Sequence, residues 1–203
     1  MQDVANEAGV SRALVSLVMR DSPKVSDQRR ALVRQTADRL GYRPNAAARS
    51  LAQNHSNTIG VILNDLHNPF FADAVDGLQA EADRHGFRLM LMAAYLDPDI
   101  ERAAMASFAE HRMDAVVVLG SNDPAPDLAH AGGGIPVVSI GRAIEGADAV
   151  VNDDERGGEL ATQHLIDLGH ELIVHIDGGT GAGASARRRG YISVMSANGS
   201  RPR

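Results

Sequence analysis

The 203-residue sequence contains no cysteine and a single lysine, Lys24. Without cysteine, the sequence forms no disulfide bonds and offers no thiolate as metal ligand or nucleophile. A phosphate-binding P-loop ends in Gly-Lys-Ser/Thr, and Lys24 does not stand in such a motif. These absences exclude disulfide-stabilised proteins, thiol-dependent enzymes and P-loop nucleotidases.

Long apolar runs are also missing, because no stretch approaches the ~20 residues that a membrane-spanning helix requires. The segment 1–4 has neither the basic start nor the apolar core of a secretory signal. Hydrophobic residues make up 44% of the sequence, which is ordinary for a folded domain. We therefore expect a cytoplasmic, globular protein.

Charge is distributed unevenly along the chain, although the formal net charge is only −6. Residues 1–57 contain nine Lys or Arg against five Asp or Glu, whereas residues 58–203 contain 11 against 21. A basic head on an acidic body concentrates the attraction for phosphate at one end of the chain. Chance variation of charge along the sequence is the alternative explanation.

Three short helices are predicted in the head. Gly9 ends the first, because glycine tolerates positive φ, and Ser11 and Ser26 are suitable N-caps for the second and third. Two short helices joined by a tight turn containing glycine are typical of a helix-turn-helix. A small helical bundle without a DNA-binding role has the same helix pattern. The predicted helices are residues 3–8, 12–19 and 27–40.

The second predicted helix carries side chains that suit a DNA groove. In a helix-turn-helix, the N-terminal residues of this helix face the base edges. Arg12 can bind guanine through two hydrogen bonds, Ala13 can contact a thymine methyl group, and Ser16 can bond a phosphate or a base. The sequence therefore favours double-stranded DNA as a partner.

The body alternates short apolar runs with amphipathic segments. Such alternation indicates a parallel sheet covered by helices on both faces. The predicted fold class is thus an all-α head followed by an α/β domain, in which ligands bind beyond the carboxyl ends of the strands. The predicted strands are residues 59–63, 89–92, 115–119, 136–140 and 172–176, and the predicted helices are residues 71–85, 100–111 and 154–168.

No catalytic or cofactor motif stands out in the sequence. The glycine-rich segment 178–184 contains a G-x-G-x-x-A match, but no acidic residue follows at the roughly 20-residue spacing of a dinucleotide site. His164, His170 and His175 lack the i, i+4 spacing of a helical zinc pair. We therefore expect no enzymatic activity, no cofactor and no metal.

Several segments together resemble the LacI/GalR (lactose-repressor) family of transcriptional regulators. The similarity continues through the body, weakly in some segments and strongly in others, as far as Gly190-Tyr191, so it covers nearly the whole chain. It implies a helix-turn-helix domain at 1–44, a hinge helix and linker at 45–57, and a periplasmic-binding-protein-like sensor domain at 58–203. The segments that carry the similarity are 3–11 (DVANEAGVS), 15–16 (VS), 22–26 (SPKVS), 40–45 (LGYRPN) and 48–51 (ARSL).

The resemblance also implies how the sensor domain is divided. Its first subdomain corresponds to about 58–152, and about 153–203 supplies only the beginning of the second. The expectation is therefore a chain truncated at its C-terminus, with an incomplete second subdomain.

The resemblance implies a set of DNA-contacting residues. In this family a leucine of the hinge helix, here Leu51, wedges between bases in the minor groove, which kinks the duplex. The sequence departs from the family at Leu14 and Leu17, where Thr and Arg are usual, so the operator preference is expected to differ. The expected DNA-binding residues are Ser11, Arg12, Ala13, Val15, Ser16, Leu17, Asn45, Ala48, Arg49 and Leu51.

An effector site is implied at the carboxyl ends of the predicted strands. Phe70 would stack on a ring of the effector, whereas Phe71 is assigned to the core. A carboxylate and a guanidinium would form charge-assisted hydrogen bonds to a polar metabolite such as a sugar. For the carboxylate, Asn152 and Asp154 leave a one-residue ambiguity around Asp153. The expected effector-binding residues are Asp65, Asn68, Phe70, Ser121, Asp153 and Arg187.

The leading hypothesis is a repressor that binds a pseudo-palindromic operator as a homodimer and responds to a small-molecule effector. One alternative is a truncated family member that acts as a heterodimer partner without its own effector response. Another is a soluble sugar-binding protein with the same body fold. The basic head and the missing export signal argue against this last alternative.

Overall fold

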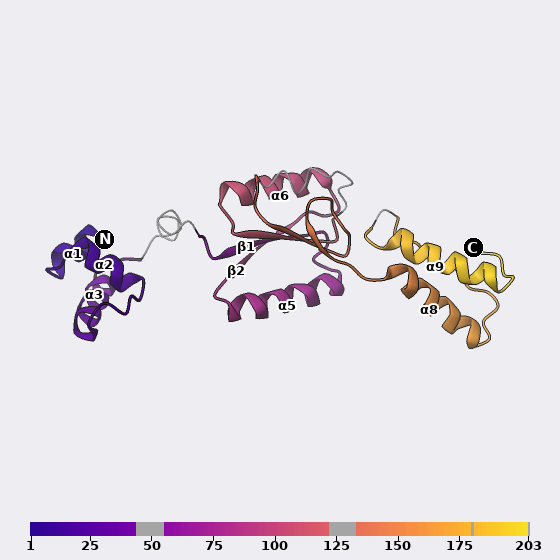
Figure 1. Cartoon of the computed structure of the whole chain (residues 1–203), viewed down its shortest axis with the longest axis horizontal. Coiled ribbons are helices and arrows are strands. Elements are labelled where there is room, and N and C mark those ends of the chain that lie inside the picture. The colour runs from indigo at the N-terminus through magenta and orange to yellow at the C-terminus, as the bar shows by residue number, and fades with distance from the viewer. Residues whose placement is uncertain (44–54, 122–132, 180, 203) are drawn as a thin grey trace. The chain divides into compact units, whose positions relative to one another are not determined.

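The computed structural model describes residues 1–43, 55–121, 133–179 and 181–202, and these form two compact units, Met1–Ser56 and Asn57–Arg203 (Figure 1). Among the described residues, none of the helices is long and apolar enough to cross a membrane. The predicted hinge residues lie outside the described part of the chain. These are Asn45, Ala48, Arg49 and Leu51.

The described part of the head contains three helices, α1 (Gln2–Glu7), α2 (Arg12–Met19) and α3 (Asp27–Arg39), which confirms the predicted pattern. Gly9 has a φ of +61°, and the Ser11 hydroxyl accepts a hydrogen bond from the Leu14 amide at 3.2 Å. Gly9 thus ends the first helix and Ser11 begins the second, as the sequence indicates. Four fully buried valines hold the helices together: Val4, Val15, Val18 and Val33.

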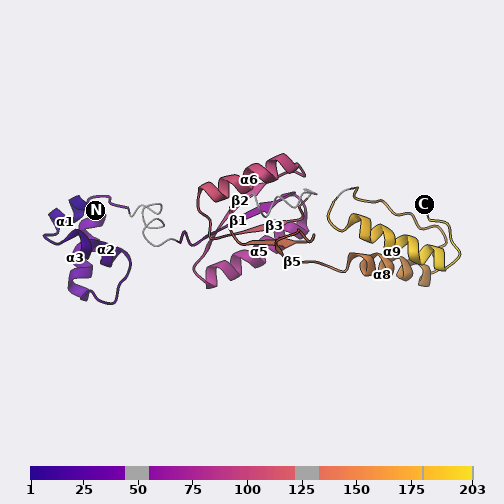
Figure 2. The same ribbon diagram turned by 45° about the horizontal axis from the view of Figure 1, so that its top comes forward.

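The body contains a parallel sheet of five strands in the order β2-β1-β3-β4-β5. Helix α6 (Pro98–Glu110) lies on one face of this sheet and α5 (Pro69–Arg84) on the other, as Figures 1 and 2 show. The predicted parallel sheet covered on both faces is therefore confirmed. Its strands are β1 (Thr58–Leu63), β2 (Arg88–Ala93), β3 (Ala115–Leu119), β4 (Val137–Ile140) and β5 (Asp148–Val150).

Helices α5 and α6 each begin two residues before their predicted starts. Asn68 caps α5 and Asp97 caps α6, and a proline occupies the first turn of each helix. Proline fits this position because its missing N–H would be unpaired there and its φ is already helical. The Asn68-Pro69 and Asp97-Pro98 steps therefore mark where α5 and α6 begin. Both positions are earlier than the starts predicted from hydrophobic periodicity.

Two further helices, α8 (Asp154–Asp167) and α9 (Ala184–Ala197), pack closely against each other. A Cβ atom at Gly158 would lie 2.3 Å from the Arg187 carbonyl oxygen, and one at Gly190 would lie 2.1 Å from the Glu155 carbonyl oxygen. Only glycine fits at both points, so the two backbones can approach closely where they cross.

The strand predicted at residues 172–176 is wrong, because this segment joins no sheet. Its side chains alternate as in a strand: Ile173 packs against Tyr191 and Met195 of α9, whereas Leu172, Val174 and Ile176 are exposed. An apolar alternation makes a strand only where a neighbouring strand completes the hydrogen-bond ladder. No strand in the described residues runs beside this segment.

Candidate DNA-binding surface and effector cavity

The N-terminal half of α2 presents part of the predicted DNA-contacting set to solvent. Arg12 and Ala13 are exposed, and Ser16 is half-buried. Val15 has no exposed surface and belongs to the core of the head, so its assignment to DNA contact is wrong. Leu17 is half-buried and also packs against this core, which its apolar side chain suits.

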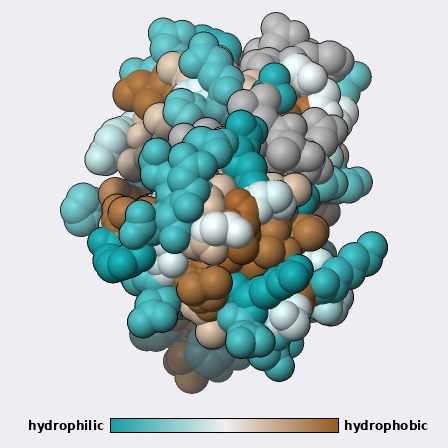
Figure 3. Space-filling view, turned by 90° about the vertical axis from the view of Figure 1, so that its left-hand side faces the viewer, coloured by the Kyte–Doolittle hydropathy of each residue, from teal (hydrophilic) through white to brown (hydrophobic). Residues whose placement is uncertain are grey.

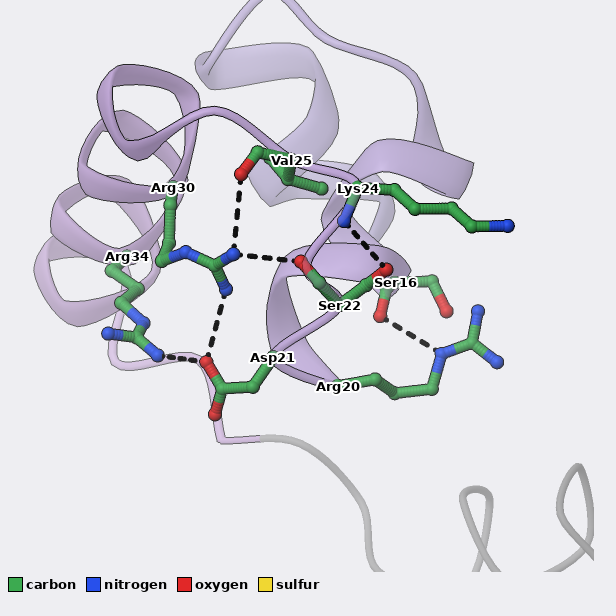
Figure 4. A network of polar contacts seen from close by, with 8 residues as sticks. All are labelled: Ser16, Arg20, Asp21, Ser22, Lys24, Val25, Arg30 and Arg34. Carbon is green, nitrogen blue, oxygen red and sulfur yellow. Dashed lines mark hydrogen bonds and ion pairs between the residues drawn. The ribbon is translucent and has the colours of Figure 1, made fainter.

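A polar network fixes the turn between α2 and α3 (Figure 4). The Asp21 carboxylate accepts hydrogen bonds from Arg34 and, at 3.2 Å, from Arg30. Arg30 also donates to the carbonyl oxygens of Ser22 at 2.8 Å and Val25 at 3.3 Å. Asp21 itself has a φ of +54°, a left-handed conformation that Asp adopts more readily than most non-glycine residues. The network therefore ties the C-terminal end of α2 to α3.

Figure 3 shows hydrophilic and hydrophobic side chains next to one another on the face that it draws. Leu32 and Leu40 are the large apolar side chains of the described head that are most exposed, each at 46%. Both belong to α3 or its C-cap, whereas the exposed residues of α2 are Arg12 and Ala13.

A cavity of about 420 Å³ lies at the carboxyl ends of β1, β3 and β4. This is the edge of a parallel α/β sheet at which ligands bind. The loop after β1 and the N-terminal parts of α5, α8 and α9 supply half of its lining residues. The lining residues are Asp65, Asn68, Phe70, Phe71, Leu96, Gly120, Gly141, Asn152, Asp154, Gly181, Ala182 and Arg187.

One wall of the cavity carries opposite charges. The Arg187 guanidinium donates to the Asp154 carboxylate at 2.5 Å and to the Ala182 carbonyl oxygen at 3.2 Å. The Arg187 side chain remains 48% exposed, whereas that of Asp154 is 15% exposed. A guanidinium that is held in place yet open to solvent can bind hydroxyl or carboxylate oxygens with charge assistance.

Another part of the wall is aromatic. The Phe70 and Phe71 rings meet edge to face, with centroids 5.4 Å apart. The Asn68 side-chain oxygen accepts a hydrogen bond from the Phe70 amide at 3.1 Å, and Asp65 accepts one from the His67 amide at 2.8 Å. These bonds fix the loop that presents the rings. An apolar surface beside an ion pair suits a ligand with both CH faces and hydroxyl groups, since each wall contacts a different part of it.

Four residues of the predicted effector set, Asp65, Asn68, Phe70 and Arg187, come together around this cavity. Phe71, which the resemblance assigns to the core, both packs in the core and lines the cavity.

Ser121 does not line the cavity: it is fully buried and donates a hydrogen bond to Glu101 at 2.6 Å. The sequence places Ser121 directly after β3 but does not reveal that a carboxylate of α6 lies within its reach. A buried hydroxyl with such a partner is satisfied inside the fold and has no need of a ligand.

Asp153 is also placed away from the cavity, because its carboxylate caps α8 by accepting from the Arg156 amide at 2.9 Å. Its neighbours Asn152 and Asp154 line the cavity instead. N-capping is the sequence signal that could have decided which of these neighbouring residues faces the cavity. An N-cap side chain turns back onto its own helix, which leaves the next carboxylate free to face outward.

Two family models match the chain. "Bacterial regulatory proteins, lacI family" matches residues 1–45, and "Periplasmic binding proteins and sugar binding domain of LacI family" matches residues 56–202. A curated relative, the HTH-type transcriptional regulator GalR of Salmonella typhimurium (strain SL1344), is 39% identical over 199 residues, which cover 96% of this chain and 58% of GalR. The chain thus spans about three fifths of the length of that relative.

Solved structures show the same fold. A LacI-family transcriptional regulator from Silicibacter pomeroyi is 28% identical and superposes with a TM-score of 0.81 over 99% of this chain and 62% of its own. The complex of the transcriptional regulator CelR with cellobiose is also 28% identical, with a TM-score of 0.62 over 98% of this chain and 62% of CelR.

Proposed function

The chain belongs to the LacI family of bacterial regulators, and we propose that it is a sequence-specific DNA-binding transcriptional repressor controlled by a small-molecule effector. The observation that carries this proposal is the exposed N-terminal half of α2, with Arg12 and Ala13 open to solvent. Side chains at this position of a helix-turn-helix contact base edges in the major groove. As a bacterial DNA-binding regulator, the protein acts in the cytoplasm.

The proposed effector is a sugar or a similar polyhydroxylated metabolite. The cavity of about 420 Å³ is within the size range of sites for small molecules. Arg187 and Asp154 offer charge-assisted hydrogen bonds to hydroxyl groups, and Phe70 offers an apolar face to the ring carbons. The cellobiose complex of CelR supports a sugar over other polar metabolites.

The proposed assembly is a homodimer that binds a pseudo-palindromic operator, because two-fold protein symmetry is mirrored in such sites. Large apolar side chains on the edge strand β2 and just after it support an interface there. Met90 and Leu91 are each 43% exposed and Tyr95 is 63% exposed. Pairing two copies would remove this surface from water.

The DNA-binding proposal is tested by in vitro selection of random duplexes with the full 203-residue chain at moderate salt. We expect an enriched palindromic sequence and a steep fall of affinity with salt, because phosphate contacts release counterions. Salt-sensitive binding without any enriched sequence would refute a sequence-specific repressor.

The effector proposal is tested on the selected operator with a panel of mono- and disaccharides. A sugar that binds the cavity should change operator affinity, and Arg187→Met should remove most of that response. Arg189→Met is the matched control: Arg189 also pairs with a carboxylate of α8, Glu155, at 2.9 Å, but does not line the cavity. Equal responses in both variants would contradict an effector site at Arg187.

A further inference from the structure

Arg20, which follows α2 directly, lies on the exposed stripe of that helix. At 100° per residue, positions 13 and 20 point in nearly the same direction, about 20° apart. Ala13 and Arg20 are both exposed, whereas Val15 and Val18 face the core. Arg20 therefore extends the surface that Arg12 and Ala13 begin.

The guanidinium of Arg20 is folded back along the helix. Its Nε donates a hydrogen bond to the Ser16 carbonyl oxygen at 3.3 Å, one turn earlier (Figure 4). Helical side chains generally lean toward the N-terminus, so this bond accords with the preferred direction of the side chain. The charged group consequently lies over the turn that contains Ser16 and Leu17, rather than beyond the end of the helix.

The neighbouring arginines of the head are engaged differently. Arg30 and Arg34 both pair with the Asp21 carboxylate, which offsets part of their charge. In the described head, Arg20 has a hydrogen bond to a backbone carbonyl and no ion pair with a carboxylate. Its Nε is occupied, but its two terminal nitrogens point away from the network in Figure 4.

We propose that Arg20 is a specificity-determining residue whose terminal nitrogens bind the O6 and N7 atoms of a guanine in the major groove. The inference rests on the proposed DNA-binding function. Bidentate binding needs a planar fork held in one orientation, and the bond from Nε to Ser16 supplies that orientation. Leu17 beside it has no donor, so Arg20 is the cation that reads the base at this turn of the helix.

The test is in vitro selection, followed by affinity and salt titrations, with the full chain and its Arg20→Ala and Arg20→Lys variants. The wild-type motif should contain a guanine in each half-site that Arg20→Ala no longer selects, while the other positions are retained. Affinity for the wild-type site should fall about 5- to 150-fold, and much less for sites that lack this guanine. Arg20→Lys should keep part of the affinity and lose most of the preference, because lysine lacks the fork.

Arg39→Ala is the matched control, because Arg39 is an exposed arginine of the same domain that lies in the last turn of α3, outside the Asp21 network, and pairs with Glu7 at 2.9 Å. It should leave the selected sequence unchanged. Uniform weakening by Arg20→Ala across all sequences, with the salt slope reduced by about 1, would identify a phosphate contact and overturn the inference. An unchanged motif and affinity would also overturn it.

Different results would refute the repressor function and the role of Arg20. If the wild-type chain selects no motif, the sequence-specific repressor itself is refuted, and the role of Arg20 with it. If the wild-type motif appears but does not depend on Arg20, only the inference about Arg20 fails. Circular dichroism of each variant checks that the exposed substitution leaves the fold intact.

Discussion

Two segments of the body have nearly the same sequence pattern but different structures. Residues 115–119 (AVVVL) form β3 in the middle of the sheet, between β1 and β4. Residues 172–176 (LIVHI) contain as many β-branched residues and only one polar residue, His175, yet they join no sheet. The difference teaches that local pattern sets the alternation of side chains, whereas strand formation depends on partners elsewhere in the chain.

Packing differs between the two segments as well. Val116 and Val118 face the core formed with α6, and Val117 and Leu119 face the core formed with α5. In 172–176, Ile173 contacts α9, while the other face remains open to solvent. Burial on both sides makes β3 sensitive to any change, and burial on one side restricts the sensitivity of 172–176 to its inward positions.

The largest effect is expected for Val118→Asp. Val118 is 1% exposed in the core beneath α6, so the substitution buries an unpaired carboxylate. Such a change costs at least about 4 kcal/mol of unfolding free energy, which is enough to unfold most domains. Urea titration followed by circular dichroism measures the loss. A native-like transition in this variant would show that β3 is not the centre of the fold.

A smaller loss is expected for Ile173→Ala, at the inward position of the unpaired segment. Ile173 is 7% exposed and packs with Tyr191 and Met195. Truncation leaves a cavity that costs roughly 2 kcal/mol, the lower end for a buried isoleucine, since the surrounding cluster is small and can relax. Hydrogen exchange should accelerate in α8 and α9 and remain unchanged in β1 and β3. Equal acceleration in both regions would contradict this separation.

The sequence predicts most of the fold because most elements carry their own local cues. Ser11 marks the start of α2, and residues 115–119 are the bounds of β3 as predicted. The site is predicted less well, because it depends on distances that local cues do not contain. Arg187 and Asp65 are correctly placed at one cavity, but only the fold shows that Ser121 is satisfied by Glu101.

The error at 172–176 has the same origin. Hydrophobic alternation reports which side chains turn inward, and Ile173 does so, but it carries no information on whether a second strand lies alongside. The error at Asp153 has another origin. The preference of Asp for the N-cap position was a local sequence signal that could have identified Asp153 as the cap of α8 and Asp154 as the residue of the cavity.

A loss of about 1 kcal/mol is expected for Tyr191→Phe. The Tyr191 hydroxyl donates to the Ile173 carbonyl oxygen at 2.9 Å and so attaches the unpaired segment to α9. Removing the hydroxyl leaves that carbonyl without this donor, while the ring keeps its stacking with His175, with centroids 5.2 Å apart. Urea titration gives the magnitude. A loss as large as that of Ile173→Ala would mean that the hydrogen bond, rather than apolar packing, holds the segment.

The smallest effect is expected for Val174→Asp, the counterpart of Val118→Asp in the unpaired segment. Val174 is 60% exposed, so a carboxylate there stays hydrated and the unfolding free energy should change by no more than about 0.5 kcal/mol. The same substitution thus separates the two segments by several kcal/mol, because water solvates the charge at one position and the core excludes water at the other. A large loss at Val174, measured by the same urea titration, would show that its side chain is covered in solution, and that 172–176 has a partner like those of β3.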